Sequence, residues 1–223
     1  MKREIIQTND GSTTIHLPEW NESYHSKHGA IQEAYHVFIK NGLLLFGSKP
    51  ISILEIGFGT GLNCFITYLE TKKIHQTIDY VGVEAYPVVV DEAMEMNYAS
   101  ELDESQSAIF KQLHNGDWEQ KNSISASFTL TKRKQFFQDI KDENAFDLIY
   151  FDAFGYRVQP ELWSEAIFAS MFRALKPNGV IVTYACRTSV KNAMLAVGFS
   201  VEKLPGAPGK REMLRATKAI VKN

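Results

Sequence analysis

Three glycines at alternating positions, Gly57, Gly59 and Gly61, constrain the fold of this chain more than any other feature of its sequence. They follow residues 51–56, a short β-branched run that predicts a buried strand, and they open residues 61–71, which predict a helix. Glycine has no Cβ, so the backbone of such a turn can approach a ligand closely. In open parallel sheets, ligands bind beyond the carboxyl ends of the strands. The sequence therefore predicts a strand–turn–helix ligand site.

The rest of the chain alternates between strand-like and helix-like segments, which predicts a doubly wound α/β sheet. The closing antiparallel pair is typical of methyltransferases rather than of dinucleotide dehydrogenases. The expected strands are 51–56, 80–84, 146–151, 180–184, 199–204 and 213–217, and the expected helices are 30–41, 61–71, 88–99, 163–175 and 189–197.

We accordingly expect a class I methyltransferase fold: a Rossmann-like, seven-stranded sheet with helices on both faces and a small N-terminal β-arm. The arm is predicted from residues 4–7 and 13–17, which flank the turn signal Asn9-Asp10-Gly11. Residues 101–145 give no readable pattern. We expect residues 1–45 to form the arm and a helix packed on a methyltransferase domain of residues 46–223.

Composition excludes several classes of protein. A formal net charge of -2 argues against a strongly basic protein that coats nucleic acid. Cys64 and Cys186 form no CxxC pair, and the six histidines show no ligand spacing, so we expect no metal site. The chain contains no apolar run of the ~20 residues that a membrane helix needs. Residues 1–4 begin no signal peptide. We expect a cytoplasmic protein without a membrane partner.

Two glutamates narrow the choice of cofactor. Glu55 lies two residues before the first glycine, and the resulting Glu-x-Gly-x-Gly-x-Gly sequence resembles motif I of class I methyltransferases, which bind S-adenosylmethionine. Glu84 ends the next strand, where an ionised carboxylate can accept hydrogen bonds from both ribose hydroxyls. A carboxylate there would repel the 2′-phosphate of NADP. The pair favours S-adenosylmethionine.

Asp152 follows the buried strand 146–151 and should face the same cleft as the glycine turn. Methyl transfer is an in-line attack, so the enzyme mainly has to align the nucleophile with the methyl carbon. An amine nucleophile must be neutral, and a carboxylate can orient its lone pair and help its proton to leave. Asp152 is therefore the predicted catalytic residue.

These residues, taken together, resemble one particular family along nearly the whole chain. It is the methyltransferase that converts 5-aminomethyl-2-thiouridine to 5-methylaminomethyl-2-thiouridine at the wobble position of tRNA. In many bacteria this activity forms one half of a bifunctional enzyme whose other half depends on FAD. The resemblance rests on Tyr24, Ser26, Gly29, Glu33, Val37-Phe38, Gly57 to Asn63, Val83-Glu84, Asp152-Ala153-Phe154, Pro160 to Trp163 and Gly209 to Leu214.

The resemblance implies roles for these positions. Asp152 would contact the substrate amine beside the methyl group, and Tyr24 would help to close the cofactor pocket. Lys210 and Arg211 would meet RNA phosphates near the mouth of the cleft. The implied cofactor-binding set is Tyr24, Glu55, Gly57, Gly59, Thr60, Gly61, Asn63, Glu84 and Asp152.

The sequence departs from the family at the adenine site. Relatives often end the third strand with Gly-Asp, whereas residues 128–134 end here without an acid, and Asn115-Gly116-Asp117-Trp118 lies earlier. Residues 154–157 read Phe-Gly-Tyr-Arg where many relatives have a Phe-Ala-Pro form. No FAD-binding segment follows, so we expect S-adenosylmethionine without FAD, and tRNA as the partner. Two alternatives stay open: a methyltransferase or aminopropyltransferase for a small-molecule amine, or a non-catalytic binding module on the same fold.

Overall fold

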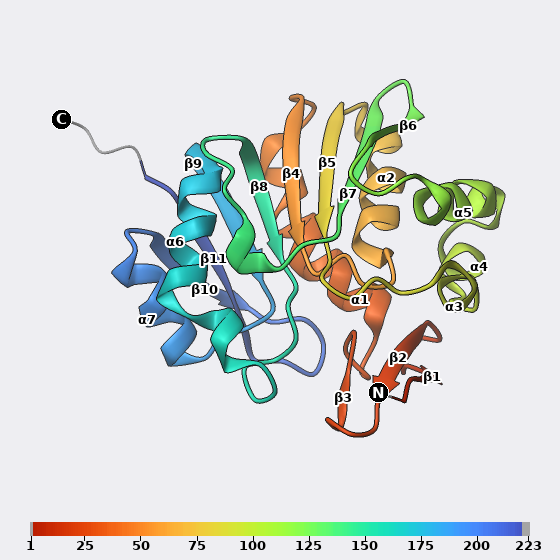
Figure 1. The fold of residues 1–223 in the computed structure, drawn as a ribbon, viewed down its shortest axis with the longest axis horizontal. Coiled ribbons are helices and arrows are strands. Elements are labelled where there is room, and N and C mark those ends of the chain that lie inside the picture. Colours follow the sequence, from red (N-terminus) through yellow and green to blue (C-terminus); the bar gives the residue numbers. More distant parts are fainter. Residues whose placement is uncertain (1, 220–223) are drawn as a thin grey trace.

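The computed structural model describes residues 2–219 and is built around one eight-stranded sheet (Figure 1). Its order is β10-β11-β9-β8-β4-β5-β7-β6. The five strands from β9 to β7 run parallel, and β6, β10 and β11 pair antiparallel at the two edges. The strands are β4 (Ile51–Ile56), β5 (Ile78–Val83), β6 (Lys121–Ser125), β7 (Phe128–Arg133), β8 (Phe146–Phe151), β9 (Leu175–Thr183), β10 (Ser200–Pro205) and β11 (Glu212–Thr217).

Helices cover both faces of this sheet, and each face has its own apolar cluster. One cluster includes Phe38 and Phe65 and the other includes Phe168 and Met194. The first face carries α1 (Ala30–Ala34), the π-helix η1 (Tyr35–Lys40), α2 (Leu62–Ile74) and α5 (Ser107–Asn115), and the second carries α6 (Glu165–Ala174) and α7 (Thr188–Ala196). The remaining short helices are η2 (Leu43–Phe46), α3 (Val90–Met94), α4 (Tyr98–Leu102), η3 (Glu104–Gln106), η4 (Phe137–Asp139) and η5 (Pro160–Trp163).

The expected α/β class, the β-arm and the closing hairpin are confirmed, while three details differ. The sheet has one strand more than expected because β6 folds back on β7. The segment 88–99 is two short helices, because Asn97 at the break bonds to the arm: its Oδ1 accepts from the backbone N–H of Thr13 at 2.8 Å. Strand β9 begins at Leu175, so residues 176–179, which lie between the expected helix 163–175 and the expected strand 180–184, belong to the strand.

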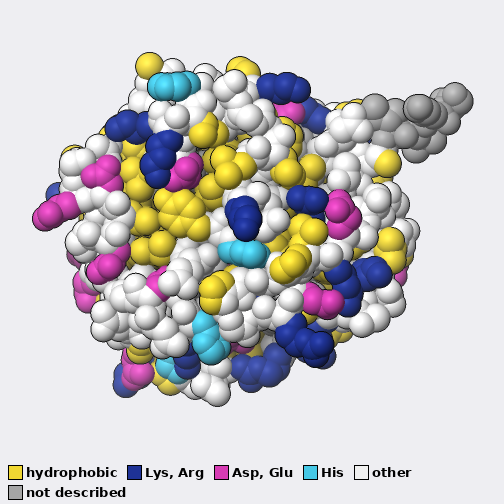
Figure 2. Space-filling model, turned by 180° about the vertical axis from the view of Figure 1, so that it is seen from behind, with side chains coloured by type: hydrophobic (Ala, Val, Ile, Leu, Met, Phe, Trp, Pro, Cys, Tyr) yellow, Lys and Arg dark blue, Asp and Glu magenta, His cyan; other side chains and the backbone are white. Residues whose placement is uncertain are grey.

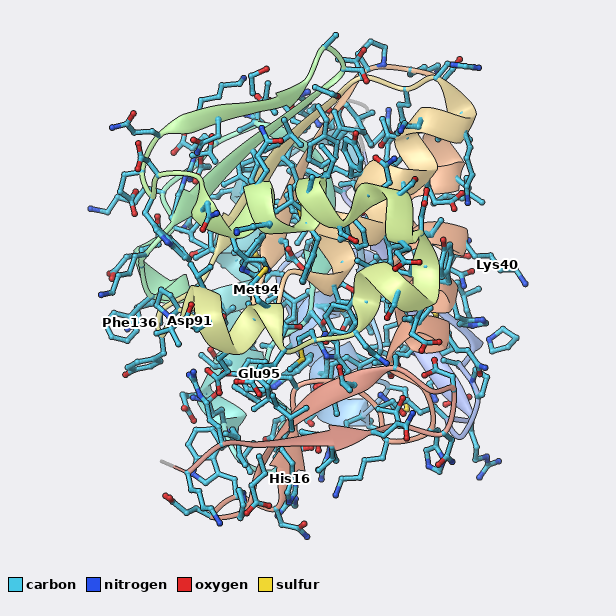
Figure 3. All side chains as sticks on the ribbon, turned by 90° about the vertical axis from the view of Figure 1, so that its right-hand side faces the viewer. His16, Lys40, Asp91, Met94, Glu95 and Phe136 are labelled. Atoms are coloured by element: carbon cyan, nitrogen blue, oxygen red, sulfur yellow. The ribbon has the colours of Figure 1, made fainter. Side chains whose placement is uncertain are left out.

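The N-terminal arm is a separate three-stranded sheet of β1 (Glu4–Gln7), β2 (Thr13–Leu17) and β3 (Glu22–Ser23). It lies below the carboxyl ends of the parallel strands in Figure 1, and Figure 3 shows its residue His16 beneath the helix that carries Asp91 and Met94. Arg157, after β8, donates to the carbonyl oxygen of Trp20 at 2.9 Å. The arm is thus held from two sides over the end of the sheet. A domain boundary at residue 45 stays a prediction.

No helix within residues 2–219 is long and apolar enough to cross a membrane.

Candidate active site

The turn after β4 strongly favours glycine at three positions. Gly57, Gly59 and Gly61 have φ values of +88°, +50° and +75°, a region that other residues rarely adopt. A Cβ on Gly57 would lie 2.6 Å from the carbonyl oxygen of Asp152, and one on Gly59 would lie 3.1 Å from Cδ1 of Tyr24. The glycines therefore let the end of β4 touch both the end of β8 and the arm.

A cavity of about 320 Å³ opens at this end of the sheet, a size typical of small-molecule sites. The arm, the glycine turn and the segments that follow β5, β7, β8 and β9 all contribute to its wall. The lining residues are Trp20, Ser23, Tyr24, His25, Gly57, Gly59, Glu84, Ala85, Tyr86, Phe136, Phe137, Gln138, Asp152, Ala153, Phe154, Gln159, Glu161, Leu162 and Tyr184.

The wall of this cavity is acidic. Among the described residues that line it, Glu84, Asp152 and Glu161 carry carboxyl groups and none is a lysine or arginine. Unpaired carboxylates in a partly buried cavity attract cations. The cavity is therefore suited to ligands that carry positive charge.

Glu84 is fixed by the backbone around it. Its Oε2 accepts from the N–H of Gly59 at 3.1 Å, and its Oε1 accepts from the N–H of Tyr86 at 3.0 Å. Burial raises the pKa of Glu84, and these N–H groups oppose that shift. Each carboxylate oxygen keeps a further lone pair for a ligand hydroxyl.

Asp152 is held by one side chain. Its Oδ2 accepts from Nδ2 of Asn63 at 2.8 Å. Burial, and then the nearby charge of Glu33, raise the pKa of Asp152 to about 7, while Asn63 and Lys210 act in the opposite direction. A carboxyl with such a pKa can both accept and release a proton near neutral pH.

Aromatic side chains from the arm and the loop after β8 form another part of the cavity wall. The ring of Tyr24 meets that of Phe154 edge-on at 5.0 Å between centroids, and Trp20 does so at 5.6 Å. Burial raises the pKa of Tyr24 to about 12, so its hydroxyl stays neutral at physiological pH. The arm is therefore a structural part of the site.

Three residues of the expected cofactor-binding set lie beneath the cavity and do not line it. Glu55 is fully buried and accepts from the hydroxyl of Tyr80 at 2.9 Å. Thr60 is fully buried as well, and its Oγ1 lies 2.9 Å from the hydroxyl of Tyr98. Asn63 is 3% exposed and reaches the site through Asp152. The structure thus places these three side chains behind the cavity lining, and their expected part in cofactor binding stays a prediction. Gly61 also lies outside the lining, at the start of α2.

Lys210 is partly exposed and lies against two other side chains of the protein. Its Nζ pairs with Oε1 of Glu33 and stands 3.9 Å from the centroid of the Tyr184 ring. Its ammonium thus has partners within the protein, and the contact of Lys210 with RNA phosphates stays a prediction. Arg211 is exposed, so its contact with RNA stays a prediction.

The part of the cavity wall that follows β7 is not predicted by the sequence. Phe136, Phe137 and Gln138, just after β7, line the cavity where the acid of relatives was expected, and the Phe136 ring packs edge-on against Tyr86 at 5.9 Å. Figure 3 shows Phe136 at the rim of the molecule. An exposed aromatic pair after two neighbouring strands is the signal that could have found this end.

The segment Asn115-Gly116-Asp117-Trp118 does not replace that acid. Trp118 lines a second cavity, of about 300 Å³, together with Lys132, and the Lys132 Nζ lies 5.1 Å from the Trp118 ring centroid. No residue of the segment lines the first cavity.

A parallel sheet with a glycine turn after one strand, a fixed carboxylate after the next and a closing antiparallel hairpin defines an α/β enzyme that binds a nucleoside cofactor at its carboxyl edge. The comparison with known families shows which family of such enzymes the chain belongs to. The model of the S-adenosyl-L-methionine-dependent methyltransferase family Methyltransf_30 matches residues 101–219, more than half of the chain, and the chain belongs to this family.

Curated relatives agree with this assignment. The chain is 27% identical to the tRNA 5-methylaminomethyl-2-thiouridine biosynthesis bifunctional protein MnmC of Cupriavidus metallidurans, over 98% of this chain and 34% of that protein. It is 29% identical to the protein of the same name from Aromatoleum aromaticum, over 88% of this chain and 32% of the relative. The chain thus spans about a third of the length of these relatives.

Solved structures confirm the fold. MNMC2 from Aquifex aeolicus superposes with a TM-score of 0.79 at 23% identity, covering 100% of this chain and 72% of the other. Spermidine synthase from Thermotoga maritima gives a TM-score of 0.62 at 15% identity, covering 98% of this chain and 69% of the other.

Proposed function

We propose that this protein transfers a methyl group from S-adenosylmethionine to the amine of 5-aminomethyl-(2-thio)uridine at the wobble position of tRNA, in the cytoplasm. The observation that carries the proposal is the position of Asp152, a carboxyl at the wall of an acidic cavity, directly against the glycine turn. The similarity to proteins named for 5-methylaminomethyl-2-thiouridine biosynthesis supports the choice of acceptor.

The residues present fit the cofactor. The backbone of Gly57 and Gly59 would border the methionine part, since both glycines line the cavity and a Cβ would press on Asp152 or Tyr24, which line it as well. Glu84 would accept from the ribose hydroxyls. Tyr86 and Phe136 would flank the adenine, with Gln138 as its hydrogen-bond partner. When bound, S-adenosylmethionine supplies a methyl carbon made electrophilic by a positively charged sulfur.

Asp152 would act on the acceptor. An aminomethyl group is largely protonated in water, and the acidic wall attracts it in that form. The ionised Asp152 accepts one of its N–H groups, orients the nitrogen toward the methyl carbon and takes the proton that the amine must lose. The aromatic wall of Trp20, Tyr24 and Phe154 would keep water from this end of the cavity.

The surface for tRNA would include Arg211. Two other basic residues of this region already have partners, because Arg215 pairs with Glu202 at 3.1 Å and Lys218 donates to the carbonyl oxygen of Leu175 at 2.7 Å. On the face seen in Figure 2, lysines and arginines are interspersed with acids and form no continuous basic field. We therefore propose that a few exposed cations, rather than a broad basic face, contact the tRNA backbone.

The test is methylation of a defined tRNA. The protein is incubated with isotopically labelled S-adenosylmethionine and tRNA from a host that lacks this methylation step, and wobble nucleosides are analysed by mass spectrometry. We expect the label on the aminomethyl nitrogen. Absence of incorporation into every 5-aminomethyl-uridine tRNA would overturn the proposal.

A second candidate is transfer of a methyl or aminopropyl group to a free small amine. The acidic cavity favours it, because a free polyamine is also a cation, and the fold resembles that of spermidine synthase. Salt separates the two candidates. Binding of a tRNA weakens steeply as salt rises because counterions are released, whereas the response to a small amine is much flatter.

A further inference from the structure

Two buried oxygen atoms beneath the catalytic carboxyl lack hydrogen-bond partners. They are Oε1 of Glu55 and Oδ1 of Asn63, and among the described residues the only other such side-chain oxygen is on Gln76. Glu55 is fully buried and Asn63 is 3% exposed. A buried hydrogen-bond acceptor without a partner lowers the stability of the folded protein. Two such acceptors on neighbouring side chains therefore need an explanation.

The partners of these two side chains define the problem. Oε2 of Glu55 accepts from the Tyr80 hydroxyl, and Nδ2 of Asn63 donates to Asp152. The Asn63 amide lies within hydrogen-bonding reach of the Glu55 carboxyl. An ionised Glu55 can only accept hydrogen bonds, and so can Oδ1 of Asn63. A single proton on Oε1 of Glu55 gives both oxygens a partner.

We propose that Glu55 is a protonated positioning residue, whose carboxylic acid donates to Oδ1 of Asn63 and thereby fixes the amide that holds Asp152. The assignment of the Glu55–Asn63–Asp152 chain rests on the contacts themselves. Its consequence for catalysis rests on the proposed function of Asp152.

The charges around Glu55 agree with a neutral acid. Complete burial is the first cause that raises the pKa of Glu55, and the charges of Asp152 and Glu84 raise it further, while Tyr80 and Asn63 act in the opposite direction. The titratable groups that face Glu55 from the neighbouring strands and helix are Asp152, Glu84, Tyr80, Tyr150 and Cys64. None of these groups is a cation that would stabilise an ionised Glu55.

The orientation of Asn63 matters to Asp152. If the amide turned over, its oxygen would face the Asp152 carboxylate, and the hydrogen bond of 2.8 Å would be replaced by repulsion between two acceptors. A proton donor at Glu55 selects the productive orientation. The glutamate of the Glu-x-Gly-x-Gly-x-Gly sequence therefore acts through Asn63 and not by touching the cofactor.

Infrared difference spectroscopy on the full chain tests the protonation directly and requires neither tRNA nor cofactor. At neutral pH, Asp152→Asn should show the carbonyl stretch of a protonated carboxylic acid, and the double variant Asp152→Asn/Glu55→Gln should lack it. The Asp152→Asn background is used because a carboxyl whose pKa is about 7 is itself partly protonated at neutral pH and contributes a band of its own. Asn63→Leu should move the band to higher frequency, because the acid loses its acceptor.

Substitutions test the positioning role. A glutamine amide has the shape of a protonated glutamic acid and can donate to Oδ1 of Asn63, so Glu55→Gln should keep methyl transfer and cofactor affinity within about threefold of wild type. Glu55→Leu should lower kcat by about tenfold or more and alter its pH profile, with a small change in cofactor affinity, because Asp152 loses a correctly oriented donor.

Two results would overturn the proposal: absence of the band in Asp152→Asn, or a loss of cofactor affinity in Glu55→Gln as large as that in Glu55→Leu. The second result would make Glu55 an ionised cofactor contact. If Glu55→Leu does not fold, the infrared spectra and the cofactor affinity of Glu55→Gln still test the proposal. Failure to methylate tRNA, with the band present, would reject the proposed function and leave the protonation of Glu55 intact.

Discussion

The ammonium of Lys210, a partly exposed side chain, stands 3.9 Å from the centroid of the Tyr184 ring. It also pairs with Glu33 of α1, so the loop before β11 is tied to the helix behind Asp152. The Tyr184 hydroxyl in turn donates to the carbonyl oxygen of Ala153 at 2.8 Å, next to Asp152. Lys210 thus supports the end of the cavity that carries Asp152.

Lys210→Met should therefore alter stability and pH dependence. Removing one partner of a largely buried ion pair should lower the free energy of unfolding by about 2–4 kcal/mol, since Glu33 is left uncompensated. The unpaired Glu33 should also move the midpoint of the pH profile of methyl transfer upward, because its charge disfavours ionisation of Asp152. Urea unfolding and kcat/KM between pH 5 and 9 measure the two effects.

Arg211→Met is the matched control for Lys210→Met. It should leave the unfolding free energy within about 0.5 kcal/mol of wild type, since Arg211 is exposed. It should weaken tRNA binding and reduce the slope of log affinity against log salt by about 1. If Lys210→Met produces this loss of slope instead, Lys210 is a phosphate contact and its internal pairing is not maintained in the complex.

Asp152→Asn should abolish most of the methyl transfer and spare cofactor binding. We expect kcat to fall by about 10²–10⁴-fold, the usual contribution of a general base. In wild type, kcat/KM should rise as the pH increases through about 7, because Asp152 acts in its ionised form and its pKa is about 7. Calorimetry of S-adenosylmethionine and the pH profile check both points. Unchanged turnover would remove Asp152 from the mechanism.

Glu84→Gln should weaken the cofactor rather than the chemistry. The amide keeps the size of the side chain but loses the charge that strengthens hydrogen bonds to hydroxyls, so we expect a loss of about 10–100-fold in affinity for S-adenosylmethionine. Glu161→Gln, at another acidic position of the wall, is the comparison. Equal losses of affinity in the two variants would show that general charge, and not the ribose contact of Glu84, holds the cofactor.

Gly57→Ala and Gly47→Ala separate backbone strain from close contact. Both glycines have positive φ, +88° and +57°, but a Cβ at Gly47 meets nothing within 4 Å, whereas one at Gly57 meets the carbonyl oxygen of Asp152 at 2.6 Å. Gly47→Ala should cost about 1 kcal/mol of stability, and Gly57→Ala about 3 kcal/mol or more, with reduced cofactor affinity. Thermal or urea unfolding of the two variants gives the comparison, and equal costs would contradict it.

The sequence predicted those features of the molecule that depend on residues close to one another in the chain. The glycine turn, Glu84 at a strand end and Asp152 after a buried strand follow from spacing and strand periodicity, and all three reach the cavity. Lys210 could not be placed, because its direction depends on Glu33 far away in the sequence. The break in the helix predicted at 88–99 likewise depends on a contact between Asn97 and the distant Thr13. Tertiary partners, not local propensity, decided each of these.

His114 links stability to pH through its burial beneath the glycine turn. Its Nε2 lies 3.1 Å from the carbonyl oxygen of Thr60, and burial, followed by the charge of Lys132, lowers its pKa to about 4. The unfolded chain, with a histidine pKa of about 6.5, binds the proton first as the pH falls. The contribution of neutral His114 to the free energy of unfolding is therefore present above pH 6.5 and is lost toward pH 4.

Between pH 7.5 and 5 this loss of unfolding free energy should reach about 2 kcal/mol. The difference in unfolding free energy between wild type and His114→Gln should shift by this amount in favour of the variant, since other titrations, including that of His25, are common to both proteins. A difference for His114→Gln that is constant with pH would mean that His114 is not held neutral in the folded protein.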